Sequence, residues 1–110
     1  MAGLTTHVLD TSVGRPAAGV VVRLFADDDR VLAEARTNAD GRCDAPLLGP
    51  DDMQAGRYRL EFSVGDYFRA NGAGGAEPSF LDVVPIAFGI AEPQAHYHVP
   101  LLISPFGYST

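Results

Sequence analysis

The segment YRLEFSV, from Tyr58 to Val64, has the most regular alternation of apolar and polar residues in the chain. Successive side chains of a β-strand point to opposite faces, so the four apolar residues would share one face. Arg59, Glu61 and Ser63 would share the other. This pattern predicts a strand with one buried face, and therefore a sheet that packs against a second layer.

Other short apolar segments lie on both sides of this strand and are separated by turn residues. The run VVVRLF, from Val20 to Phe25, is β-branched and apolar on nearly every position, which predicts a central strand covered on both faces. Further expected strands include Thr5–Leu9, Val31–Thr37, Phe80–Ile90 and His96–Ser104. The spacing of these segments predicts an all-β sandwich or barrel of seven or eight strands.

Glycine and proline punctuate the chain, with 12 Gly and 8 Pro along its length. Asn38 to Gly41 is a strong turn signal, and Pro85 and Pro100 call for edge or unpaired positions in their strands. One short helix is expected over Tyr67–Ala70, capped by Asp66. No linker or repeat divides the sequence, so residues 1–110 are expected to form a single domain.

Composition excludes several classes of function. A net charge of −6 leaves no basic footprint for nucleic acid, and no apolar run is long enough to span a membrane. The segment Met1 to His7 has neither a basic start nor a long apolar stretch, so no secretory signal is expected. Cys43 is the one cysteine, which excludes an internal disulfide. We therefore expect a cytoplasmic protein that binds neither nucleic acid nor membrane.

Three histidines are the first candidates for chemistry. His96 and His98 are two residues apart on one expected strand, so both side chains leave the same face, and His7 lies on the first strand. An imidazole with a pKa near neutrality suits acid–base work. The three histidines also resemble a zinc ligand set, but no acidic residue lies near the pair to support metal binding, so no metal is expected.

Arg42 directly follows the turn and precedes Cys43. A solvated surface arginine is the ordinary interpretation of such a residue. The functional interpretation is a planar charged fork that binds a carbonyl and stabilises an oxyanion. Cys43 would point to the opposite face, and we expect a buried structural thiol rather than a nucleophile.

Several segments together closely resemble the 5-hydroxyisourate hydrolases, the enzyme branch of the transthyretin-related proteins. They are Thr6–Asp10, Gly14–Ala17, Asp40–Arg42, the His-Tyr-His-Val-Pro block that runs from His96 to Pro105, and Gly107–Thr110. The match spans nearly the whole chain. Transthyretin itself, the hormone carrier, lacks the histidines at the matching positions.

The resemblance implies a transthyretin-like two-sheet β-sandwich of seven or eight strands with one short helix, assembled as a homotetramer. It implies hydrolysis of 5-hydroxyisourate, a product of urate oxidase, without metal or organic cofactor. The family's catalytic and substrate-binding residues match His7, Arg42 and His98, and His96 matches a supporting position. The family pattern continues with Tyr-Arg-Gly-Ser after Ser109-Thr110, and a chain lacking that segment would bind substrate weakly.

Three other functions remain open from the sequence. The resemblance also implies a central channel between facing subunits that holds the active sites. A transthyretin-type protein could bind a small molecule in this channel without turnover. A metal-dependent hydrolase would use the three histidines as ligands. A purely structural sandwich domain would need neither Arg42 nor His98.

Overall fold

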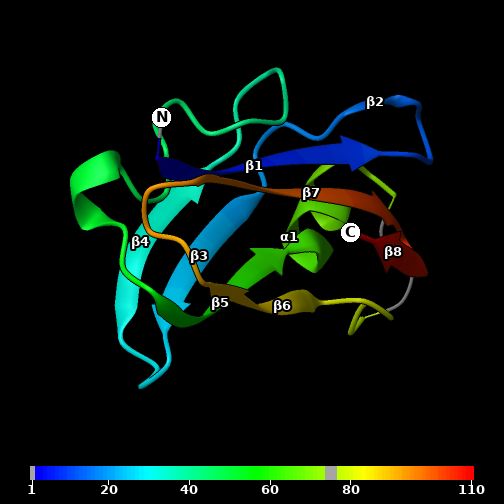
Figure 1. Ribbon diagram of the computed structural model, residues 1–110. Helices are drawn as coiled ribbons and strands as arrows, with labels where there is room; N and C mark the ends of the chain where they lie inside the picture. The colour runs from blue at the N-terminus through cyan, green and yellow to red at the C-terminus, as the bar shows by residue number, and fades with distance from the viewer. Residues whose placement is uncertain (1, 74–76) are drawn as a thin grey trace.

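The computed structural model describes residues 2–73 and 77–110, which form two four-stranded sheets (Figure 1). The first, here the β1–β7 sheet, has the order β2-β1-β7-β8. Its strands are β1 (Gly3–Asp10), β2 (Arg15–Pro16), β7 (His96–Ser104) and β8 (Gly107–Ser109). The second, the β3–β5 sheet, has the order β4-β3-β5-β6. Its strands are β3 (Val21–Ala26), β4 (Val31–Arg36), β5 (Gly56–Ser63) and β6 (Val83–Ile90). The expectation of an all-β, two-sheet sandwich with one short helix is confirmed.

The core lies between the sheets and is built from the inward-facing residues of both. Leu60 and Phe62 are fully buried, as the alternation of YRLEFSV predicts. They pack with fully buried residues of three other strands: Leu4 and Val8 of β1, Val22 and Leu24 of β3, and Leu101 and Ile103 of β7. Each side chain of this kind stabilises the fold by about 1.5–3 kcal/mol.

The pairing of β1 with β7 is parallel, and the sequence pattern did not predict it. Thr5 lies opposite His98, and His7 lies opposite Pro100. The two strands lie side by side along nearly their whole length (Figure 1), so one face of this pair collects side chains from both ends of the chain.

The last expected strand, His96–Ser104, is followed by the short β8, so β7 is an inner strand. Pro100 is tolerated there because β8 pairs only with Leu102 to Ser104. Beyond that end, the Pro100 carbonyl accepts a hydrogen bond from the Thr110 hydroxyl at 2.7 Å. The proline therefore occupies a position left unpaired on one side, as predicted from its missing N–H.

The helix begins earlier than expected. Strand β5 ends at Ser63, and α1 runs over Val64–Ala70, so Val64 is buried as a helical residue rather than as the last strand residue. Asp66 is in the first turn instead of at the cap, a position where its charge is still favoured. The helix ends at Asn71-Gly72 as predicted, and Gly72 has a φ of 73°. A second short element, a 3₁₀ turn, spans Pro50–Asp52.

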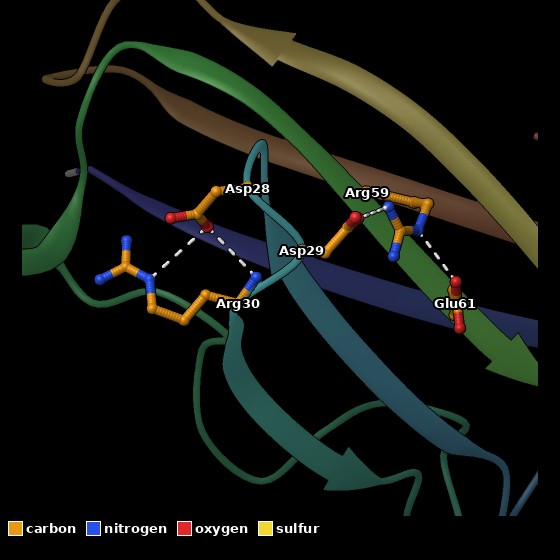
Figure 2. A network of polar contacts seen from close by, with 5 residues as sticks. All are labelled: Asp28, Asp29, Arg30, Arg59 and Glu61. Atoms are coloured by element: carbon orange, nitrogen blue, oxygen red, sulfur yellow. Dashed lines mark hydrogen bonds and ion pairs between the residues drawn. The ribbon is translucent and has the colours of Figure 1, made fainter.

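The outward face of the β3–β5 sheet carries a network of ion pairs (Figure 2). Arg59 bonds Asp29 at 2.8 Å and Glu61 at 2.9 Å, and Arg30 bonds the carboxylate of Asp28. Arg59 also lies over the ring of Phe25, 4.3 Å from its centroid. This network ties the turn between β3 and β4 to the neighbouring strand β5.

Strand β6 is at the edge of its sheet, as Pro85 and Gly89 predict, but it begins at Val83 rather than Phe80. Among the described residues, none of the helices is long and apolar enough to cross a membrane.

Candidate active site

Imidazoles from two strands meet on the outward face of the β1–β7 sheet. His96 and His98 are exposed on β7, and His7 is partly exposed on β1. The parallel register places Thr5 directly opposite His98 and diagonally across from His96, and His7 lies two residues further along β1. The predicted same-face pair is therefore present, and the first-strand histidine shares its face.

Arg42 reaches the same face through the turn that precedes it. The Asn38 side chain accepts hydrogen bonds from the backbone N–H groups of Asp40 and Arg42, and the Asn38 N–H donates to the Arg42 carbonyl at 2.7 Å. Arg42 then forms an isolated antiparallel bridge with His7. The turn thus places the backbone of Arg42 beside that of His7, and the positive charge of Arg42 acts on the His98 ring.

Gly41 is required for this geometry. Its φ is 75°, in the left-handed region that residues with a Cβ rarely adopt. A Cβ at this position would lie 2.3 Å from the Val8 carbonyl oxygen. The Gly41 carbonyl also accepts a hydrogen bond from the Val8 N–H at 2.8 Å, which fastens the turn to β1.

The His7 ring has a fixed tautomer. Its Nε2 lies 2.8 Å from the backbone carbonyl oxygen of Asp40. A carbonyl oxygen only accepts hydrogen bonds, so Nε2 carries the proton. In the neutral ring the Nδ1 atom is then bare, and it is the one His7 atom that can accept a proton.

Thr5 belongs to this cluster and was not singled out from the sequence. Its hydroxyl lies 2.8 Å from Nδ1 of His98 and 3.2 Å from Nε2 of His96. Threonine is common in strands, so nothing in the local sequence marks it. Only the parallel register, which needs contacts between residues more than 90 positions apart, reveals it.

His98 is exposed as a residue, but partial burial of its ring lowers its pKa below the ordinary value, and the nearby positive charges of Arg42, His7 and His96 lower the pKa further. His98 is consequently neutral at pH 7, the form in which a ring nitrogen can accept a proton. Within the part of the chain that the structure describes, no carboxylate lies within ion-pair distance of Arg42 or of the three histidines.

Cys43 lies next to the cluster and is half-buried against the core rather than fully buried. Burial raises the pKa of its thiol, and the negative charge of Asp44 raises it further. The thiol is therefore protonated and a poor nucleophile at pH 7. This agrees with the expectation of a structural role.

A hollow of about 290 Å³ opens at the cluster, lined by Thr5, Arg42 and His96 among others. It combines a cation, hydroxyl groups and imidazole, which suits a small polar ligand that accepts hydrogen bonds. Across residues 2–73 and 77–110, there is no group of three or more His, Cys, Asp or Glu side chains arranged to hold a metal ion.

Comparison with known sequences identifies a family and similar proteins. Residues 4–110 match the HIUase/Transthyretin family. The chain is 57% identical over 110 residues to the 5-hydroxyisourate hydrolase of Mesorhizobium japonicum, covering 97% of this chain and 88% of that protein.

Solved structures show the same fold. The 5-hydroxyisourate hydrolase of Klebsiella pneumoniae superposes with a TM-score of 0.82 at 38% identity, covering 99% of this chain and 95% of that one. An (S)-allantoin synthase gives a TM-score of 0.91 at 38% identity, but this chain spans only 42% of that longer protein. The transthyretin of Sparus aurata gives 0.84 at 28% identity, covering 99% and 94% of the two chains.

Proposed function

The chain belongs to the HIUase/Transthyretin family, and from this membership we propose that it hydrolyses 5-hydroxyisourate. The observation that carries the proposal is the meeting of His7, Arg42 and His98 on one exposed face without a neutralising carboxylate among the described residues. The higher identity to hydrolases than to transthyretin, 38% against 28% among the solved structures, favours the enzyme over the carrier.

We assign Arg42 the role of binding the substrate and stabilising the negative charge that develops on it. 5-Hydroxyisourate is small, planar and rich in carbonyl groups, and a guanidinium forms two parallel hydrogen bonds to such an edge. Attack of water on the ring carbonyl places negative charge on its oxygen, and the fixed positive charge of Arg42 stabilises that charge. The turn from Asn38 to Gly41 supports this role because it holds the backbone of Arg42 before substrate arrives.

We assign His98 and His7 the role of orienting the attacking water and accepting its proton. Water must lose a proton as it attacks, and a neutral imidazole of lowered pKa accepts one at pH 7. His7 has a bare Nδ1 because its Nε2 donates to the Asp40 carbonyl. We assign joint orientation of the water to the two rings, and a supporting role to His96. No metal takes part in this mechanism.

The proposed active form is a homotetramer in the cytoplasm. Leu102, Phe106 and Tyr108 at the end of the β1–β7 sheet are exposed in the single chain, which is unfavourable unless other subunits cover them. Light scattering should show a mass about four times that of the chain, and a monomer at micromolar concentration would contradict the proposed tetramer.

The direct test is to add freshly prepared 5-hydroxyisourate and to follow the decay of its ultraviolet absorbance with and without protein. We expect the protein to accelerate the decay, and Arg42→Gln to abolish most of the acceleration. Arg23→Gln is the matched control, because Arg23 is paired with Glu34 on the other sheet. Binding of the substrate without faster decay would instead indicate a carrier.

A further inference from the structure

The hydroxyl group of Thr5 bridges two histidines of the site. It lies 2.8 Å from Nδ1 of His98 and 3.2 Å from Nε2 of His96, both within hydrogen-bond distance. Thr5 is directly opposite His98 in the parallel register of β1 and β7, so the backbone of both strands holds this contact.

A hydroxyl group has a single proton to donate. Thr5 can therefore donate to at most one of the two rings. If it accepts from both rings, the proton of His98 is on Nδ1. If it donates to one ring and accepts from the other, two arrangements satisfy both contacts. In the first, Thr5 donates to Nδ1 of His98, and the proton of the neutral His98 ring is on Nε2. In the second, Thr5 donates to Nε2 of His96 and accepts from Nδ1–H of His98, and Nε2 of His98 is bare.

The proposed hydrolysis, on which this inference rests, selects the second arrangement. Nδ1 of His98 already contacts Thr5, so Nε2 is the atom left to meet a water. We propose that Thr5 is a positioning residue that holds the proton of His98 on Nδ1 and keeps Nε2 free to accept the proton of the attacking water. His96 completes the arrangement because its Nε2 takes the hydrogen bond of the Thr5 hydroxyl.

The same bridge favours the protonated state that forms during the reaction. When Nε2 of His98 accepts the proton of water, the ring becomes a cation. Its Nδ1–H then makes a charge-assisted hydrogen bond to the Thr5 oxygen, which is stronger than the neutral one. The gain comes as the proton moves, so it lowers the barrier rather than merely binding substrate.

Three variants test the role of Thr5. Thr5→Val keeps the shape and the β-branch but removes the hydroxyl, whereas Thr5→Ser keeps the hydroxyl. Thr11→Val is the matched control, because Thr11 directly follows the same strand and donates to the Ile103 carbonyl of β7 at 3.1 Å, but does not line the hollow. We expect Thr5→Val to lower kcat about tenfold with little change in KM, and Thr5→Ser to retain activity within about twofold. Thr11→Val should keep both kcat and KM.

A second measurement does not depend on turnover. The ¹⁵N chemical shifts of the His98 ring report which nitrogen is protonated in the free protein. We expect a protonated Nδ1 and a bare Nε2 in the wild type and in Thr5→Ser. In Thr5→Val we expect the proton to move to Nε2, the preference of a free imidazole side chain.

The outcomes separate this inference from the proposed function. A wild-type His98 with a bare Nδ1, or a Thr5→Val variant with unchanged tautomer and kcat, would overturn the role of Thr5. If the wild type does not hydrolyse 5-hydroxyisourate but Thr5→Val moves the proton of His98, the proposed function is wrong and the positioning by Thr5 remains. Should Thr5→Val fail to fold, the wild-type tautomer and the activity of Thr5→Ser still decide the question.

Discussion

Two arginines on the outward face of the β3–β5 sheet are paired with carboxylates, whereas the cations of the candidate site are not. On the β3–β5 sheet, Arg23 and Arg59 each bond carboxylates, and Figure 2 shows Arg59 held between Asp29 and Glu61. On the β1–β7 sheet, Arg42 and the histidines have no carboxylate within ion-pair distance among the described residues. The contrast is sharper because the chain as a whole carries a net charge of −6.

Paired arginines stabilise a fold, whereas an unneutralised cluster is available to a ligand. Grouping cations without partners is electrostatically unfavourable in the free protein. Burial is the main cause that lowers the pKa of His98, and the charges of Arg42 and His7 lower it further. A bound molecule that offers carbonyl oxygens and develops negative charge would relieve that cost. Substitutions on the two faces should therefore separate activity from stability.

The largest effect on activity is expected from the histidines. His98→Asn and His7→Asn should each lower kcat by about 10² to 10⁴, the range for a lost acid–base group. Steady-state kinetics with 5-hydroxyisourate measures this loss, and circular dichroism checks that the fold is kept. Near-normal turnover in a folded variant would remove that histidine from the mechanism.

The elements of the fold could be predicted from local pattern, but their pairing could not. The alternation in YRLEFSV gives β5 and its buried face, and the Asn38 turn gives the end of β4. The parallel contact of β1 with β7 joins the two ends of the chain, and no short segment encodes it. The early start of α1 at Val64 was also missed, because an apolar residue after a strand fits a longer strand equally well.

Some residues of the candidate site could likewise be predicted from the sequence, and others could not. His7, Arg42 and His98 carry recognisable chemistry and stand in a recognisable order, so they could be proposed from the sequence. Thr5 could not, because its importance depends on one hydroxyl lying between two rings of another strand. The tautomer of His7 likewise depends on the Asp40 carbonyl, which the turn brings to it.

Arg42→Lys tests whether the candidate site needs the two parallel hydrogen bonds of a guanidinium, because it keeps the positive charge that Arg42→Gln removes. Lysine keeps the positive charge but cannot form two parallel hydrogen bonds. Loss of one hydrogen bond of a charged group corresponds to a decrease in kcat/KM of about 10- to 150-fold. Arg23→Lys on the paired face is the control and should leave kcat/KM unchanged. If both variants are fully active, a general positive potential is sufficient and bidentate binding is wrong.

Gly41→Ala should lower both the stability and the activity of the protein. The substitution forces alanine into the left-handed region, at a cost of about 1–3 kcal/mol, and places its Cβ against the Val8 carbonyl. The melting temperature would fall by roughly 4–8 °C for each kcal/mol, and activity would fall as Arg42 is displaced.

Gly14→Ala separates the cost of the left-handed backbone conformation from the cost of the Cβ clash. Gly14 has a φ of 69°, but a Cβ there would meet nothing within 4 Å. It should therefore show the cost of the backbone conformation without the clash, and it should keep its activity. An equal loss in both variants would show that the close approach to β1 is unimportant.

The pH dependence of activity should reflect the cationic surroundings of His98. Protonated His98 cannot accept a proton from water, so activity falls as pH drops through the pKa of this ring. Because burial and the charges of Arg42, His7 and His96 lower that pKa, the acid limb of kcat/KM should lie below the ordinary value of about 6.5. An NMR titration of Arg42→Gln should give a higher pKa for His98, since one of the positive charges is gone. An unchanged or lower pKa would contradict the electrostatic coupling of the two residues.

The smallest effect is expected from Arg59→Gln, at the centre of the network in Figure 2. The side chain of Arg59 is 31% exposed and that of Asp29 is 75% exposed, so solvent screens the pair and each contact is worth little. Loss of the ion pairs and of the contact with Phe25 should together lower the free energy of unfolding only slightly. Thermal unfolding at low and high salt measures this, and the difference from wild type should shrink as salt increases. The activity of Arg59→Gln should match that of the wild type, because the residue lies on the other sheet. A loss of activity without a loss of stability would mean that the two faces are coupled, and the division between a structural and a functional face would be wrong.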